Sequence, residues 1–218
     1  MIDMHTHSLF SDGELIPSEL VRRFEVLGYS AVGITDHADP SNLDFIITNI
    51  VKFAAELNGS QPVKVIPGIE LTFVPPDLIA AYVNKARELG AKLIVVHGES
   101  VVEPVPEGTN RAAIEAGADI LAHPGLISEE EVKLAAKKEV FLELTSRKGH
   151  SLSNGHVARL SVDCGARLVL NSDTHSIGDP MTENFAKKVV EGAGLPSHYL
   201  KTLLSNSLQL LERIGYPL

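Results

Sequence analysis

The sequence predicts a single α/β domain in which parallel strands alternate with helices. Short runs rich in β-branched residues alternate with longer segments of helical periodicity along almost the whole chain. At 218 residues and 44% hydrophobic content, the chain is long enough to bury a full core. No linker, low-complexity segment or shift in composition divides it, so we expect one domain over residues 1–218.

Each predicted strand is a short apolar run. The first is followed by a helical segment at 16–28, in which Leu20, Val21 and Phe24 lie on one face and Gly28 can end the helix. The seven predicted strands are 2–5, 31–35, 63–71, 92–97, 119–123, 140–145 and 167–172. The further predicted helices are 42–57, 76–89, 109–116, 128–138, 154–164, 181–192 and 197–214.

Two of these helices follow the last strand, and the final one carries an apolar stripe. We expect this stripe to pack against the core, because such a face is more often buried than kept for a partner. The stripe consists of Leu200, Leu203, Leu204, Leu208, Leu211 and Ile214.

Composition narrows the function classes. The formal net charge of −9 would repel a phosphate backbone, so nucleic-acid binding is not expected. A single cysteine, Cys164, excludes an intrachain disulfide framework and fits a reducing compartment. No signal-like segment precedes His5, and the apolar runs are far shorter than a membrane span. We therefore expect a soluble cytoplasmic protein without a membrane partner.

Polar residues that can bind metals follow nearly every predicted strand. A β/α barrel would bring these strand ends together on one face. Because side chains alternate along an extended chain, His5 and His7 should point to the same side, and so should Asp173 and His175. The segments are HTH at 5–7, TDH at 35–37, GIE at 68–70, VHGE at 96–99, AHP at 122–124 and SDTH at 172–175.

These segments, with Asp12 of the SDG turn, supply nine nitrogen and oxygen donors. This number exceeds the needs of one tetrahedral ion, so we expect two or three divalent ions. Imidazole and carboxylate ligands without thiolates suit zinc, manganese or iron. His150 lies outside the pattern, at a position from which it can reach the mouth. The nine donors are His5, His7, Asp12, His37, Glu70, His97, His123, Asp173 and His175.

In this order, HTHS with SDG, ITDH, GIE, the strand-end His97, AHP and SDTH resemble the motifs of the polymerase and histidinol phosphatase (PHP) family. The resemblance spans Asp3 to about His175, and the six motifs are specific in combination. It implies a distorted TIM-like barrel of seven β/α units with a trinuclear metal centre, in agreement with the seven strands counted above.

Carried over residue by residue, the family pattern implies a ligand set for each ion. Some relatives have a histidine near the position of Asp12, so the third site here has an additional carboxylate, which favours manganese or iron. The implied sets are His5, His7, Glu70 and Asp173 for the first ion, Glu70, His97 and His123 for the second, and Asp12, His37 and His175 for the third.

A multinuclear centre of this kind indicates hydrolysis, and a phosphoester suits it because its non-bridging oxygens bind metal ions. Arg147 follows the sixth strand on the same face and can bind phosphate through two parallel hydrogen bonds. We therefore expect a phosphomonoester hydrolase in which Glu70, Asp173 and Arg147 are the catalytic candidates, Arg147 also being the substrate-binding residue.

The substrate is expected to be a small phosphorylated molecule. The longest active-face loop, at 98–110, contains Glu99, Glu103 and Glu107 but no aromatic residue for stacking a nucleobase. These carboxylates favour an amine-bearing substrate such as histidinol phosphate over nucleotides.

Two other functions remain open. The amidohydrolases also use a first-strand HxH and a last-strand aspartate, although SDG, TDH and seven strands speak against them. A non-catalytic scaffold, or an RNA-binding role like that of the ribonuclease P subunit whose fold the chain resembles, is disfavoured by nine filled donor positions and the acidic charge.

Overall fold

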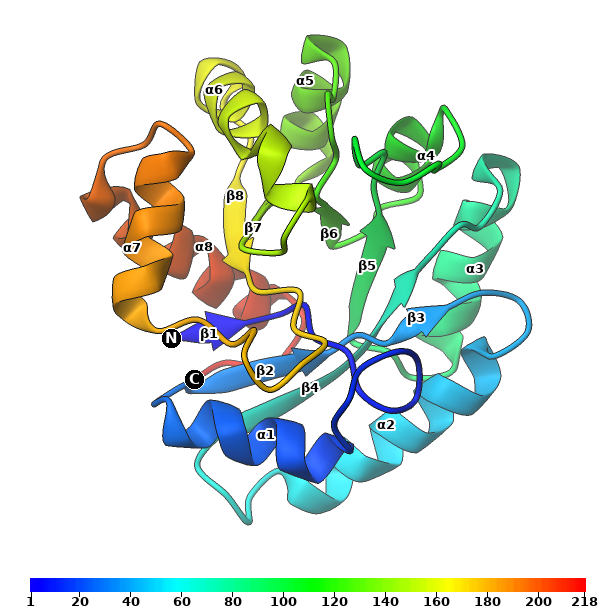
Figure 1. Cartoon of the computed structure of the whole chain (residues 1–218). Helices are drawn as coiled ribbons and strands as arrows, with labels where there is room; N and C mark the ends of the chain where they lie inside the picture. Colours follow the sequence, from blue (N-terminus) through cyan, green and yellow to red (C-terminus); the bar gives the residue numbers. More distant parts are fainter.

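The computed structural model describes residues 1–218 and confirms the predicted α/β fold, a distorted TIM-like barrel (Figure 1). Its strands are β1 (Ile2–Asp3), β2 (Ala31–Ile34), β3 (His37–Ala38), β4 (Lys64–Leu71), β5 (Leu93–His97), β6 (Ile120–Ala122), β7 (Phe141–Thr145) and β8 (Leu168–Asn171). All neighbours pair in parallel in the order β1-β2-β4-β5-β6-β7-β8, and β3 pairs with β4 outside this path. The seven strands of the path correspond to the seven predicted ones.

Helices surround the strands (Figure 1). Pro17 begins the first helix, and Ser128 and Glu131 form a capping box at the start of the fifth. The α-helices are α1 (Pro17–Val26), α2 (Leu43–Leu57), α3 (Pro76–Glu88), α4 (Thr109–Glu115), α5 (Glu129–Lys138), α6 (Asn154–Cys164), α7 (Glu183–Gly192) and α8 (Leu200–Arg213). Two short 3-10 helices are η1 (His150–Ser153) and η2 (Ser197–Tyr199).

The barrel closes where its first and last strands meet. Thr6 and Thr174 form a parallel bridge just beyond the ends of β1 and β8, and the N–H of His7 donates to the carbonyl of Thr174 at 2.8 Å. Lower on the same seam, the N–H of Met4 donates to Oδ1 of Asn171 at 2.9 Å. This seam is short, since no other ladder joins β1 to β8.

The inside of the barrel changes from apolar to polar along the strands. On β5, Leu93 and Val95 belong to the apolar cluster inside the barrel, and His97 is the next residue on that face. On β7, Phe141 belongs to the same cluster, and Glu143 is the next inward residue. The interior of the barrel is therefore filled by apolar side chains at the N-terminal ends of the strands and lined by polar side chains at their C-terminal ends.

The stripe predicted on the last helix is partly wrong. Leu208 is exposed, whereas Leu210, which was not assigned to the stripe, is fully buried. Ser207 lies in the middle of the buried face and donates to the carbonyl of Leu203. Because Ser207 is polar, the pattern of apolar residues alone did not identify the buried face correctly. Leu210 and Leu211 complete the apolar cluster inside the barrel.

None of these helices has both the length and the apolar character needed to cross a membrane.

Candidate metal centre

All nine donors predicted from the sequence lie together at the C-terminal ends of the strands, and His150 joins them. The group consists of four overlapping clusters, in each of which ligand-competent atoms lie within 4.8 Å of one another, and two of these clusters together form the first of three parts. His37 is the register partner of Glu70 in the β3–β4 pair, so sheet pairing itself sets these two side by side. The first part combines the cluster of His5, His7 and Glu70 with the cluster of His5, His123 and Asp173. The second part is His97, His123 and His150, and the third is His7, Asp12, His37 and His175.

The first part is deeply buried. Nε2 of His5 lies 3.3 Å from Oε1 of Glu70, and Nε2 of His7 lies 3.2 Å from Oδ1 of Asp173. The side chains of His5, His7 and Glu70 are inaccessible to solvent. The four residues are those that the resemblance implies for the first ion.

The second part contains a residue that the motifs did not include. The ring of His150 stacks on that of His123 with centroids 4.1 Å apart, and Nδ1 of His150 lies 2.5 Å from Oγ of Ser100. This contact can hold the ring with Nε2 directed towards Glu103, whose Oε1 is 3.5 Å away. The one sequence signal for His150 is its place just after the strand at 140–145, on the active face.

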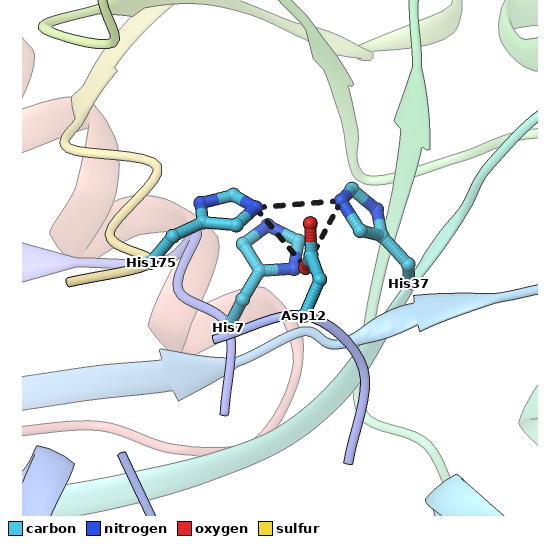
Figure 2. Close-up of side chains that lie close together, drawn as sticks. All are labelled: His7, Asp12, His37 and His175. Carbon is cyan, nitrogen blue, oxygen red and sulfur yellow. Dashed lines mark hydrogen bonds and ion pairs between the residues drawn. The ribbon is translucent and has the colours of Figure 1, made fainter. Parts of the chain in front are cut away.

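The third part is the most accessible (Figure 2). Nε2 of His175 and Nε2 of His37 lie 3.2 and 3.5 Å from Oδ1 of Asp12, and 3.4 Å from each other. The Asp12 side chain is 58% exposed. His7 completes this cluster, although the resemblance implies it only for the first ion.

A fixed loop carries Asp12 to this position. Asp36 accepts hydrogen bonds from the backbone N–H and the hydroxyl of both Ser8 and Ser11. A Cβ on Gly13 would lie only 2.3 Å from the carbonyl oxygen of His7, so only glycine allows the loop to pass this close. Asp36 thus orients the loop that carries Asp12.

Glu143, inside the barrel on β7, positions two of the histidines through hydrogen bonds. Its Oε1 accepts hydrogen bonds from Nδ1 of His5 and Nδ2 of Asn171, both at 2.8 Å, and its Oε2 accepts one from the backbone N–H of His123. With Nδ1 of His5 held by Glu143, its Nε2 faces Glu70 and is the nitrogen that an ion would bind. A carboxylate behind an imidazole is the usual support of a metal-ligating histidine.

The protonation states of two buried rings suit metal binding. Burial lowers the pKa of His7 well below its ordinary value, and the neighbouring His37 and His175 lower it further. Burial and His97 lower the pKa of His123 in the same way. Both rings are therefore neutral at pH 7, as metal ligation requires.

The carboxylate between them is ionised. Burial acts to raise the pKa of Glu70, but the nearby His5 and His37 outweigh it and hold that pKa well below its usual range. The neighbouring carboxylates in turn outweigh burial and raise the pKa of His5 and of His37, so these two rings would release a proton when an ion binds.

Several buried polar atoms here have no hydrogen-bond partner. Such atoms are costly in a protein interior, so a cluster of them indicates an ion that would bind them. Their chemistry, nitrogen and carboxylate oxygen without sulfur, fits zinc, manganese or iron. They are Nε2 of His5, both ring nitrogens of His7, Oε1 of Glu70, Nδ1 of His123 and Oδ1 of Asp173.

Backbone strain is also concentrated here. Four residues other than glycine have positive φ, and His123 (27°), Asp173 (54°) and Phe73 (54°) lie at the mouth of the barrel. Such conformations cost about 1–3 kcal/mol each and occur most often at functional sites.

Arg147, the predicted phosphate-binding residue, lies further out. Nη1 of Arg147 is 3.3 Å from Oδ2 of Asp179, and the same oxygen accepts a hydrogen bond from the N–H of His175. Arg147 therefore lies beside the loop that carries His175, while the neighbouring Lys148 is exposed. Arg111 pairs with glutamates on the surface and lies in none of the clusters.

A family model described as PHP domain matches residues 3–146. An uncharacterized protein from Methanocaldococcus jannaschii is 48% identical over 215 residues, which cover 97% of this chain and 99% of that protein. Ribonuclease P protein component 3 from Methanosarcina barkeri is 30% identical over 149 residues, or 62% of this chain. This chain spans about half of the component 3 protein, 53% of its length.

Two solved structures share the fold. A chain in the cryo-EM structure of archaeal ribonuclease P with mature tRNA aligns with a TM-score of 0.73 and 18% identity, covering 99% of this chain and 92% of that one. The histidinol phosphate phosphatase from Lactococcus lactis, complexed with zinc, L-histidinol and phosphate, aligns with a TM-score of 0.60 and 17% identity, covering 89% and 94%.

Proposed function

Because this chain belongs to the PHP domain family, we propose that it is a metal-dependent phosphoesterase that hydrolyses a small phosphomonoester. The observation that carries this proposal is the convergence of buried nitrogen and carboxylate atoms without hydrogen-bond partners at the mouth of the barrel. Divalent ions bound there would supply an activated water at neutral pH and stabilise the charge that develops on the phosphoryl group.

The proposed ligand sets follow the three parts of the site, with Glu70 added to the second. Oε1 of Glu70 lies 3.3 Å from Nε2 of His5 and 3.7 Å from Nε2 of His123, between the first and second sets, so Glu70 is suited to bridging. His7 lies between the first and third sets, and His150 adds a third imidazole to the second. The proposed sets are His5, His7, Glu70 and Asp173; Glu70, His97, His123 and His150; and Asp12, His37 and His175 with His7 nearby.

The glutamates of the loop at 98–110 differ in their contacts, which indicates which of them can bind an amine of the substrate. Glu99 is engaged, because its Oε1 accepts a hydrogen bond from the N–H of Asn110 at the start of α4. Glu103 is 37% exposed at the mouth, with Oε2 3.0 Å from Nε2 of His97. Among the three glutamates of this loop, Glu103 is therefore the candidate partner for a cationic group on the substrate.

A substrate panel on protein loaded with zinc, manganese or iron tests the proposal. We expect hydrolysis of phosphomonoesters and not of cyclic amides, with kcat/KM highest for histidinol phosphate among histidinol phosphate, an uncharged sugar phosphate, adenosine monophosphate and a short oligonucleotide. Cleavage of cyclic amides alone would support the amidohydrolase alternative. A preference for either nucleotide substrate would contradict the amine-recognising pocket.

A second candidate function, RNA binding, is favoured by the similarity to ribonuclease P protein component 3. The charge of −9 and the ten metal-competent side chains at the mouth speak against a purely structural role on RNA. Measuring tRNA binding at low and physiological salt distinguishes the two, because binding that dominates over hydrolysis in metal-loaded protein would favour the RNA role.

Arg147→Ala should weaken substrate binding and leave the metal content unchanged. Loss of charge-assisted hydrogen bonds to phosphate should lower kcat/KM by about 10- to 100-fold, mainly through KM. Lys148→Ala is the matched control, since Lys148 is exposed and adjacent. Kinetics of Arg147→Ala equal to those of the parent would mean that another group binds the phosphate.

His150→Ala should weaken the binding of one ion. The imidazole supplies one of three nitrogen ligands in its cluster, so metal retained after dialysis should fall by about one ion per chain, and the visible spectrum of the Co²⁺-loaded protein should change. His156→Ala is the control, because Nε2 of His156 lies 2.7 Å from the carbonyl of Ile127, outside the clusters. An unaltered spectrum and metal content in His150→Ala would exclude His150 as a ligand.

A further inference from the structure

A hollow of about 390 Å³ opens beside the metal centre. Asp12 and His37 line one side, and Phe73 and Glu103 line it as well. Asp12 and His37 of the third ligand set line the hollow directly, and Glu103 connects it to His97 of the second set. Its volume is in the range of small-ligand pockets, about 300–1,000 Å³.

Phe73 is the one phenyl ring in this hollow, and core packing does not explain its position. It is 46% exposed, and its ring packs at 25° to that of His97 with centroids 5.6 Å apart. It also has φ of 54°, a left-handed conformation that is unfavourable for a bulky residue.

The neighbours of Phe73 fix it in this position. Val74 is buried on one side, and Oγ1 of Thr72 on the other lies 2.7 Å from Nδ1 of His37. Pro75 and Pro76, at the start of α3, follow directly and restrict the backbone. These contacts fix the backbone on both sides of Phe73, and its ring packs beside that of His97.

The geometry points to a subsite for an aromatic ring: we infer that the hollow receives the non-phosphate end of the substrate, where an aryl or heteroaryl group stacks on Phe73. This inference rests on the phosphomonoesterase activity proposed above and names its substrate class. The carboxylates of Asp39 and Glu103 on the same lining favour a neutral or cationic ring over an anionic one.

Two matched substrates isolate the aromatic contribution. Benzyl phosphate and cyclohexylmethyl phosphate both carry the phosphate on a CH₂ group and differ in the ring alone. The cyclohexyl ring is the more hydrophobic, so a preference for benzyl phosphate reports stacking and not apolar burial. We expect kcat/KM to favour benzyl phosphate by about three- to tenfold, the size of an aromatic pair beyond its area burial.

Variants test whether the preference for benzyl phosphate depends on Phe73. Phe73→Leu should abolish the preference, Phe73→Tyr should keep it, and Phe45→Leu should leave it unchanged, since Phe45 is exposed but does not line the hollow. Metal content is measured in each variant, so that a disturbed His97 is recognised as such. Equal hydrolysis of the two esters by the parent, or a preference that survives in Phe73→Leu, would overturn the inference.

Calorimetry with non-hydrolysable analogues separates this inference from the proposed activity. Benzylphosphonate should bind metal-loaded protein more tightly than cyclohexylmethylphosphonate, again by about three- to tenfold. If neither ester is hydrolysed but this difference in binding is found and is lost in Phe73→Leu, the subsite stands and the proposed activity fails. Equal binding of the two phosphonates would overturn the subsite.

Discussion

Glu70→Gln is expected to lower kcat/KM by about 10³-fold or more and to reduce metal binding at the centre. Glu70 is fully buried, and its two oxygens lie 3.3 Å from Nε2 of His5 and 2.6 Å from Nδ1 of His37. Glutamine has no negative charge and only one acceptor oxygen, so it cannot bridge two ions as a carboxylate does. An effect of this size is typical of losing a group that organises charge at a reaction centre.

The comparison with Asp12→Asn tests the bridging role itself. Asp12 is 58% exposed and belongs to one cluster, so its amide variant should lose less activity and at most one ion. Circular dichroism and thermal unfolding should show a folded barrel in both variants. Equal losses in the two would mean that Glu70 is an ordinary terminal ligand.

Removal of metal with a chelator is expected to abolish hydrolysis and to destabilise the barrel. A ligand present at about 1,000 times its dissociation constant stabilises the native state by about 4 kcal/mol, which for a chain of this size is about 10 °C in Tm. Elemental analysis after reconstitution should give two or three transition-metal ions per chain, and the activity should return with them.

The stoichiometry decides between models of the centre. One ion per chain at saturation would exclude the trinuclear arrangement, and protein purified without chelator that contains no metal would favour a non-catalytic role. Loading with Mg²⁺ serves as a control, because this ion prefers oxygen ligands and should not restore full activity in a histidine-rich site.

Most of the fold was predictable because buried parallel strands have a clear signature in the sequence. The run at 63–71 differs from β4 by one residue, since apolar and β-branched residues fill both faces of a central strand. The two-residue strand β3 was missed, because His37 and Ala38 carry no strand pattern of their own and pair only through contact with β4.

The candidate metal-binding residues that follow strand ends were predictable from the sequence. Site residues whose positions depend on loop conformation were not. The spacing of His5 and His7 and of Asp173 and His175 indicated a cluster, although these residues lie just beyond β1 and β8, on either side of the Thr6–Thr174 bridge. His150 depends instead on Ser100, fifty positions away in the chain. Phe73 depends on an unusual backbone conformation, which no local pattern of residues indicates.

The seam of the barrel has a consequence for how the chain folds. It joins Met4 to Asn171, residues 167 positions apart, and closing so long a loop is entropically unfavourable and slow. The residues on either side of the Thr6–Thr174 bridge are His5, His7, Asp173 and His175. An ion bound by these side chains would cross-link the two ends of the barrel and so stabilise the closed seam.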